Sequence, residues 1–181
     1  YLPAAESLGS QFLVAWNEGA NANGSRVLAS RVSAAGVILD PTPIVVGPGQ
    51  RHEVAPAVTV DGTNFVVAFT GFDGNVYARR VGADGGLVDA SPIPLGIPGV
   101  DLKATFDGTH ALIASVEPSS GPNQISVTRI GANGVRTGPF VVVSSQNPAA
   151  TGGPSDVAAA GAQGVLLSAE RELISPNAYS G

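Results

Sequence analysis

The chain has 181 residues, of which 44% are hydrophobic and only 13% charged, so the composition favours one folded domain with a sizeable core over a disordered chain. Its net charge of −5 and single lysine, Lys103, leave no basic surface for nucleic acid or an anionic membrane, and we expect neither as a partner. The absence of cysteine excludes disulfides and thiolate metal sites, and no apolar run is long enough to predict a transmembrane segment.

Two motifs recur along the chain. The first, a turn followed by an apolar strand, occupies residues 8–16, 61–69, 107–115 and, in a weaker copy, 160–168. The second, a strand followed by a glycine turn, occupies residues 27–36, 76–85 and 125–134. Each copy of the second motif carries an arginine at the same place, and these arginines (Arg31, Arg80 and Arg129) are 49 residues apart. A fixed spacing of this size indicates a tandem structural repeat.

Each repeat contains four short strands. In the second repeat we place them at residues 57–60, 65–70, 75–81 and 93–95. Asp-Gly turns between them supply the positive φ that tight hairpins need. Because residues 65–70 are apolar on both faces, we expect a sheet covered on both sides, as in a β-propeller. No segment has the apolar period of a helix, so we expect almost none.

We therefore predict an all-β chain of β-propeller blades, each with four antiparallel strands in about 49 residues, with about three and a half blades present. The chain forms a single propeller segment, 1–181, with repeats at about 1–53, 54–102 and 103–152 and a partial repeat at 153–181. Closed propellers need at least about four blades. We expect the remainder of a longer chain, or next a capping protein partner, or a second copy, to complete the ring. The first residue, Tyr1, fits a processed product or fragment.

The repeat resembles the blade repeats of secreted or surface β-propeller proteins of bacteria. The resemblance is carried by Asp-Gly-x-x-Phe-Val-Val-Ala-Phe at 61–69 and Tyr-Ala-Arg-Arg-Val-x-x-x-Gly at 77–85. The chain lacks the Gly-His and Trp-Asp marks of WD40 repeats and the Ser-x-Asp-x-Gly-x-Thr-Trp box of sialidases. The resemblance implies export and hence an extracytoplasmic location (periplasmic, cell-surface or secreted), and it specifies a fold rather than an activity.

Two kinds of connection vary in length between repeats: the one from second to third strand and the one to the next blade. In an up-and-down blade both emerge on the same side, which predicts a binding rim there. These connections are residues 17–26, 47–54, 70–75, 96–102, 116–124 and 144–156. The candidate rim residues for contacting a ligand are Phe72, Asp73, Tyr77, Asp101 and Glu117. The aromatic ones would stack on a sugar ring, whereas the acids are more simply read as solvated loop residues.

The repeated arginines have two interpretations. They would form a ring of cations for an anionic ligand, or they would pair between blades with turn aspartates such as Asp61, Asp84 or Asp107. Because residues present in every repeat usually serve folding, we favour the structural interpretation for Arg31, Arg80, Arg129, Asp61 and Asp107.

Other chemistry has little support in the sequence. Glycoside hydrolysis needs two carboxylates about 5–10 Å apart, and nothing in the spacing of Glu53 or the rim acids brings two together. The two histidines, His52 and His110, have no metal-ligand spacing, and the Asp-Gly turns lack a complete calcium loop. Trp16 matches Phe69 in register, which favours core filling over ligand binding. We therefore predict no catalytic residue, cofactor or metal site.

The sequence thus favours a non-catalytic, exported propeller segment that acts as a structural or protein-interaction module. The alternative is a carbohydrate-binding or carbohydrate-active propeller that uses the variable-loop rim. Aromatic residues and acids meeting in one place on that rim would favour the alternative.

Overall fold

The computed structural model describes residues 3–21, 24–50, 55–117, 124–144, 156–160 and 163–167. These residues form three four-stranded antiparallel sheets and one two-stranded sheet, in which strands follow one another in chain order. Blade 1 contains β1 (Ala4–Leu8), β2 (Gln11–Asn21), β3 (Gly24–Ser33) and β4 (Ile44–Gln50). Blade 2 contains β5 (Ala57–Val60), β6 (Phe65–Thr70), β7 (Asn75–Val81) and β8 (Ile93–Pro98). Blade 3 contains β9 (Val100–Phe106), β10 (His110–Glu117), β11 (Gln124–Gly131) and β12 (Arg136–Ser144), and β13 (Asp156–Ala160) pairs with β14 (Gln163–Leu167).

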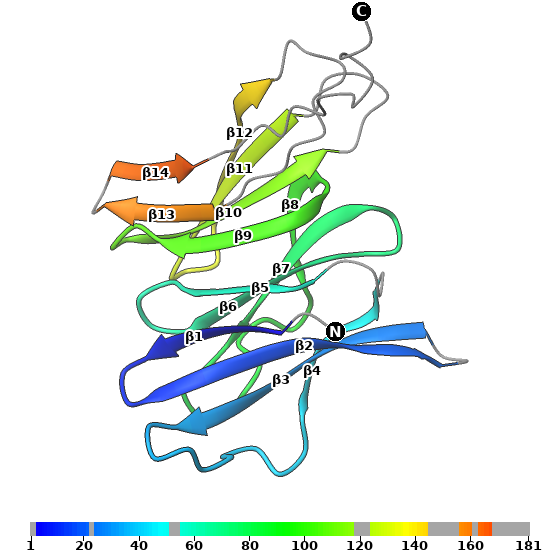
Figure 1. Ribbon diagram of the computed structural model, residues 1–181, viewed down its shortest axis with the longest axis vertical. Helices are drawn as coiled ribbons and strands as arrows, with labels where there is room; N and C mark the ends of the chain where they lie inside the picture. The colour runs from blue at the N-terminus through cyan, green and yellow to red at the C-terminus, as the bar shows by residue number, and fades with distance from the viewer. Residues whose placement is uncertain are drawn as a thin grey trace, which may run out of the picture.

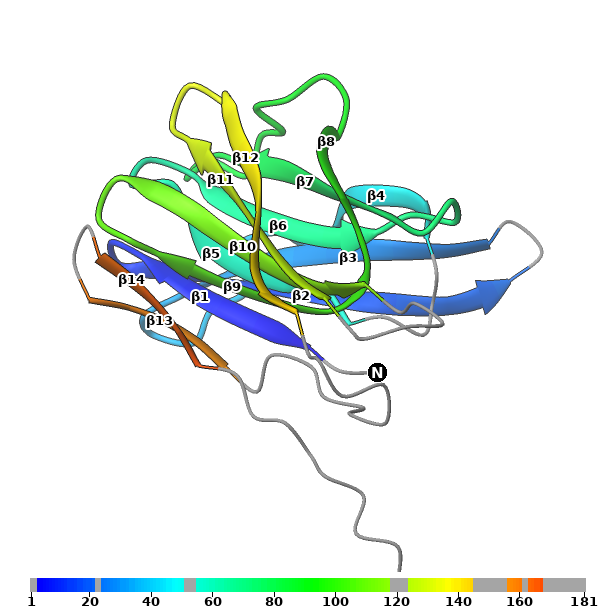
Figure 2. The same cartoon turned by 90° about the horizontal axis from the view of Figure 1, so that it is seen from above.

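The sheets stack one after another along the chain (Figure 1). The first strands of successive sheets lie against each other: β5 contacts β1 and β9, and β13 contacts β9. Seen from above, the fourth strands β4, β8 and β12 lie along the other side of the stack (Figure 2). This arrangement of up-and-down sheets with their first strands together is that of propeller blades. The prediction of an all-β chain with three and a half four-stranded blades is confirmed.

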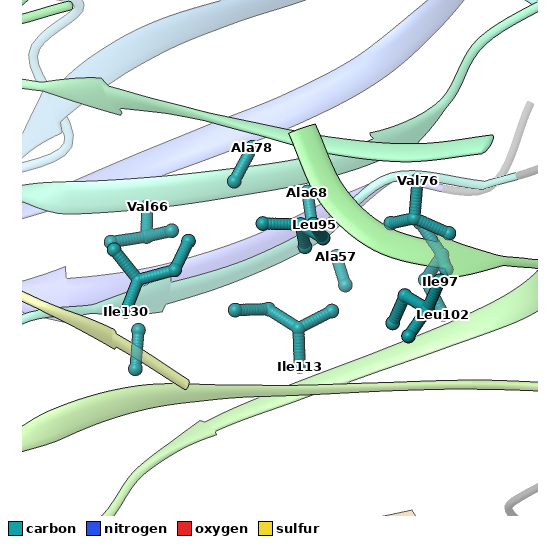
Figure 3. Close-up of a cluster of buried hydrophobic side chains, with 11 residues drawn as sticks. Ala57, Val66, Ala68, Val76, Ala78, Leu95, Ile97, Leu102, Ile113 and Ile130 are labelled. Carbon is teal, nitrogen blue, oxygen red and sulfur yellow. The ribbon is translucent and has the colours of Figure 1, made fainter. Parts of the chain in front are cut away.

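Two apolar layers hold the blades together. The layer between blades 1 and 2 includes Leu13 and Ala15 on one side and Phe65, Val67 and Phe69 on the other. The layer between blades 2 and 3 is shown in Figure 3, where aliphatic side chains of β6, β7 and β8 face Leu102, Ile113 and Ile130. Blade 2 is therefore covered on both faces, and every residue of β6 is buried. This explains why its strand is apolar at consecutive positions rather than at alternate ones.

The strand positions predicted for blade 2 agree with the structure at β5, β6 and β7, and β8 runs on to Pro98. The rim loops were predicted too long. Residues 17–21 and 24–26 continue β2 and β3, because Asn17 pairs with Val27 and Glu18 pairs with Arg26 across the hairpin. The Glu18 carboxylate also forms an ion pair with the Arg26 guanidinium. The polar residues that we predicted to form a loop are thus paired residues of a longer β-hairpin.

The other variable connections are also partly strand. Residues 47–50, 96–98, 100–102, 116–117 and 144 belong to strands, whereas 51–54, 118–123 and 145–155 lie outside the described residues. Within the part of the chain that the structure describes, no helix is long and apolar enough to cross a membrane.

Candidate functional site

The turn from β6 to β7 and the link from β8 to β9 meet at one end of the blades. Gly99 in the link donates its N–H to the carbonyl of Gly74 in the turn, at 3.0 Å. The hydroxyl of Thr70 donates to the Gly99 carbonyl at 2.9 Å, and the hydroxyl of Ser115 donates to the Pro98 carbonyl at 3.0 Å. We call the surface formed by residues 70–75, 98–101 and 115–117 the variable rim. The prediction that these connections emerge together is confirmed for this part of the rim.

The β6–β7 turn brings three of the predicted rim residues together. Phe72 stands at the tip of the turn with 61% of its surface exposed. Next to it, one oxygen of the Asp73 carboxylate (Oδ2) accepts hydrogen bonds from the Tyr77 hydroxyl at 2.7 Å and from the Asn75 side-chain amide at 2.7 Å. The other oxygen (Oδ1) accepts the backbone N–H of Asn75 at 3.0 Å. The exposed Phe72 is thus followed in the same turn by a carboxylate held by three donors.

A glycine makes this arrangement possible. A Cβ atom on Gly71 would lie 2.7 Å from the Asp73 Oδ1 and 2.8 Å from Cε2 of the Tyr77 ring. Both distances are shorter than the closest contacts that Cβ atoms make in proteins. Any larger residue at position 71 would therefore push the Tyr77 ring or the Asp73 carboxylate away. The turn is closed by the N–H of Gly74, which donates to the Gly71 carbonyl at 3.0 Å.

The Tyr77 ring is anchored in the core, and only its hydroxyl serves the rim. The ring stacks on Phe69 with centroids 6.1 Å apart and planes 21° from parallel. Tyr77 also faces Phe69 directly in the β6–β7 register. Since Phe69 is 1% exposed, the Tyr77 side chain bridges the apolar layer and the rim. The aromatic side chain offered to a ligand is therefore Phe72.

The hydrogen bonds stabilise the charged form of Asp73. The side-chain amide of Asn75 and the hydroxyl of Tyr77 hold the pKa of Asp73 below its usual value, because both donate to the charged form. The same contact raises the pKa of Tyr77, whose proton is held by Asp73. Asp73 is thus an ionised acceptor near neutral pH. It does not suit the role of a general acid, which needs a raised pKa.

The remaining two rim candidates, Asp101 and Glu117, lie on β9 and β10. Asp101, near the start of β9, is exposed and has φ of 51°, a left-handed conformation that is uncommon for aspartate. It lies close to the Gly99 link, where the pairing of β9 with β10 shifts register. Glu117 ends β10 opposite Gln124, and its side chain lies outside what the structure describes.

The repeated arginines lie at the opposite end of the blades. The Arg31 guanidinium pairs with Asp40 at 2.6 Å and the Arg80 guanidinium pairs with Asp89 at 2.6 Å, each within its own blade. Both pairs are about nine-tenths buried. The shortest ion pairs are thus made with Asp40 and Asp89, which we did not predict. Of the turn aspartates that we predicted as partners, Asp61 forms a longer ion pair with Arg80, at 3.9 Å, and Asp84 lies within electrostatic range of Arg31. The signal that sequence reasoning missed is an aspartate nine residues after the arginine, repeated 49 residues later.

The contacts of these arginines between blades are made with backbone carbonyls. Arg31 donates from Nη1 to the Ala83 carbonyl of blade 2, and Arg80 donates from Nη1 to the Ala132 carbonyl of blade 3, both at 2.5 Å. We call the surface of these turns, residues 33–40, 82–89 and 131–138, the constant rim. The guanidinium groups are thus bound to protein atoms, which leaves no ring of cations for an anionic ligand at Arg31 and Arg80.

The two turn aspartates have a local role. The Asp61 carboxylate accepts the backbone N–H groups of Thr63 and Asn64, at 2.9 and 2.7 Å, and so closes the β5–β6 turn. Asp107 does the same in the β9–β10 turn. Although burial alone would raise it, the pKa of Asp107 is lowered by these backbone donors and by nearby His110 and Arg129. Arg129 therefore lies within electrostatic range of a turn aspartate, whereas its ninth following residue is Gly138.

The other candidates contribute no site. His110 Nδ1 lies 3.7 Å from the Asp107 carboxylate, and His52 and Glu53 lie outside the described residues. In the described ranges no group of three or more His, Asp or Glu side chains is arranged to hold a metal ion. Trp16 occupies the register of Phe69 but is only half-buried, on the face of blade 1 that points away from blade 2.

Neither a protein-family model nor a curated protein matches this sequence. A solved structure does match its fold. The chain resembles the catalytic domain of the GH62 α-L-arabinofuranosidase of Coprinopsis cinerea, with a TM-score of 0.50 and 14% sequence identity. The match covers 81% of this chain and 51% of the other, so the chain spans about half the length of the structure it matches. At this identity the likeness shows the fold, a β-propeller.

The match corrects one prediction. The sequence predicts that the chain is not an enzyme, and this is contradicted, because the matched propeller is a catalytic domain. The predicted accessory role receives no support from it.

Proposed function

We propose that this chain is part of a carbohydrate-recognising β-propeller, and that the variable rim at the β6–β7 turn contacts the sugar. The observation that carries the proposal is the β6–β7 hairpin, in which an exposed aromatic residue, Phe72, is followed by a carboxylate, Asp73, that the Tyr77 hydroxyl fixes by a hydrogen bond. The likeness to a carbohydrate-active catalytic domain supports it.

The chemistry of the cluster matches that of a sugar. A sugar ring has apolar C–H faces and a rim of hydroxyl donors. The Phe72 ring offers a flat apolar surface for the C–H faces. The ionised Asp73 carboxylate can accept charge-assisted hydrogen bonds from the sugar hydroxyl groups. Because Tyr77 and Asn75 already fix the carboxylate, little side-chain freedom is lost when a hydroxyl binds.

The test compares rim variants with a matched control. Phe72→Ala removes the exposed ring, and Asp73→Asn removes the charge while keeping the shape. The control is Val135→Ala on the constant rim, since Val135 is 59% exposed and Phe72 is 61% exposed. Binding to a panel of neutral polysaccharides is measured by glycan array and titration calorimetry. Release of reducing sugar from bound polysaccharides is followed in the same samples.

We expect Phe72→Ala to weaken binding by about tenfold or more, as truncation of an anchor side chain does. Val135→Ala should leave binding unchanged. The proposal fails if the chain binds no glycan, or if Phe72→Ala and Val135→Ala weaken glycan binding equally. The extracytoplasmic location implied by the resemblance is part of the proposal, and fractionation of the source cells tests it.

A further inference from the structure

Neighbouring blades are joined by the same contact twice. Arg31 of blade 1 reaches the Ala83 carbonyl of blade 2, and Arg80 of blade 2 reaches the Ala132 carbonyl of blade 3. In both cases a glycine of the receiving turn lies under the guanidinium. A Cβ atom on Gly85 would lie 2.8 Å from the Arg31 Nη2, and one on Gly134 would lie 2.7 Å from the Arg80 Nη2. Each receiving turn is therefore a seat for an arginine of the preceding blade.

Blade 1 contains the same seat. Ala34 and Gly36 stand 49 residues before Ala83 and Gly85, in the turn between β3 and β4. Gly36 has φ of 79°, close to the 87° of Gly85, so the two turns have the same backbone form. Around Gly36, however, none of the described residues lies within 4 Å of the position that a Cβ atom would take. The turn on blade 1 is built like the other two, but no side chain of the described residues fills it.

An apolar face adjoins this seat. On blade 2, Phe65, Val67 and Phe69 pack against blade 1 and are at most 1% exposed. Their counterparts on blade 1 are Phe12, Val14 and Trp16, which share the same pairing register. Phe12 is 44% exposed, and the other two are half-buried. Figure 1 shows blade 1 at the end of the stack, with no other labelled strand on its outer side. An apolar sheet face of this kind is a surface that another element covers.

We propose that blade 1 receives a further four-stranded blade of the same repeat, carried on the same polypeptide outside residues 1–181, whose third-strand arginine donates to the Ala34 carbonyl. The chemistry of the seat selects this occupant, since the two equivalent seats both hold such an arginine. The source in cis follows from the tandem repeat, in which each unit packs on its sequence neighbours.

A second copy of residues 1–181 that docked through its own blade 1 would not fill the seat. Its Arg31 and Arg80 are already bound to its own Ala83 and Ala132 carbonyls. The outer side of its blade 3 is covered by its own β13, which lies against β9. If the blade 1 faces of two copies met, neither seat would receive an arginine.

Trp16 is the only tryptophan of residues 1–181 and lies on the proposed docking face, so its fluorescence, isolated in each protein by subtracting the emission of a Trp16→Phe variant, reports coverage of that face. The natural polypeptide that contains residues 1–181 is compared with the isolated 181-residue chain. In the natural polypeptide we expect blue-shifted emission and loss of acrylamide quenching, independent of protein concentration. Equal quenching in both proteins would overturn the proposal. Protection of Trp16 that appears in the isolated chain as concentration rises would overturn it in favour of a second copy.

A second measurement tests the seat itself. Asparagine tolerates the left-handed conformation, so Gly36→Asn tests the space above the turn rather than the backbone. Gly85→Asn must displace the Arg31 guanidinium. The control is Gly9→Asn in blade 1, where φ is 61° and none of the described residues lies within 4 Å. In the isolated chain only Gly85→Asn should lower the melting temperature relative to Gly9→Asn. In the natural polypeptide Gly36→Asn should lower it as much as Gly85→Asn does. A Gly36→Asn variant that remains equal to Gly9→Asn there would contradict an arginine in the seat.

Discussion

The ion pair between Arg80 and Asp89 is the contact whose removal should damage the propeller most. Asp89 Oδ1 accepts a hydrogen bond from Arg80 Nη2 at 2.6 Å, and Asp89 Oδ2 accepts one from the Arg80 backbone N–H at 2.8 Å. The two side chains are 9% and 11% exposed. Asp89→Ala would leave the guanidinium in place without its main counter-charge, at the point where Arg80 also holds Ala132 of blade 3.

The expected loss follows from this burial. Breaking a buried ion pair by removing one partner costs about 3–5 kcal/mol, because the remaining charge is uncompensated. Here Arg80 keeps the Ala132 carbonyl and Asp61 at 3.9 Å, so the lower end applies. We expect a loss of about 3 kcal/mol in the free energy of unfolding. For a chain of this size this corresponds to a fall of about 6–12 °C in melting temperature.

The assay is urea denaturation followed by circular dichroism, with Glu18→Ala as the control. Glu18 also pairs with an arginine, Arg26, but the two side chains are 41% and 42% exposed. Exposed pairs contribute about 1 kcal/mol or less. Replacing both partners, as in Arg80→Met with Asp89→Ala, should recover part of the loss, because no buried charge remains. If Asp89→Ala and Glu18→Ala cost the same, the argument from burial is refuted.

Two further results are expected. Tyr77→Phe removes the hydroxyl that donates to Asp73 Oδ2, so the pKa of Asp73 should rise towards its ordinary value in an NMR titration of the carboxylate. An unchanged pKa would show that the hydroxyl does not hold the carboxylate. The Arg31 guanidinium lowers the pKa of Asp40, so the stability that this pair adds is complete above the unfolded-state value of about 3.9 and is lost as the pH falls through the lower folded-state pKa. The difference in unfolding free energy between the natural chain and Asp40→Asn should therefore be constant from about pH 5 to 7 and shrink below about pH 4. A difference that grows in acid would contradict the pairing.

The residue pattern alone predicts the blades, because strand pairing inside a blade is local. Residues 57–60, 65–70 and 75–81 are strands separated by turns of a few residues, and turn chemistry together with two-sided apolar character marks their ends. The length of the β2–β3 hairpin was underestimated because its end is formed by polar residues. Polar residues such as Glu18 and Arg26 are typical of loops, but they also stabilise a ladder when they face each other across it.

The candidate site was predicted in its members but not in its geometry. Phe72 and Asp73 were assigned to the rim because they lie in a connection of variable length, and Tyr77 was added as an aromatic surface candidate. That Tyr77 stacks on Phe69 and donates to Asp73 depends on the hairpin register and on Gly71, whose missing Cβ lets the ring approach. Asp40 and Asp89 were missed because their spacing from the arginines has meaning only once the chain returns beside its own third strand.

The sequence by itself therefore determined the repeat, the all-β class, the strands of a blade and the side on which its connections vary, since these follow from local periodicity and turn residues. The tertiary structure decided which charges pair, which donors hold the Asp73 carboxylate, and that the same apolar positions are buried in blade 2 and only half-buried or exposed in blade 1. Phe65 is fully buried and Phe12 is 44% exposed although they occupy equivalent places in the repeat. The difference is the neighbouring blade, because burial depends on what packs against a face and not on the residues that form it.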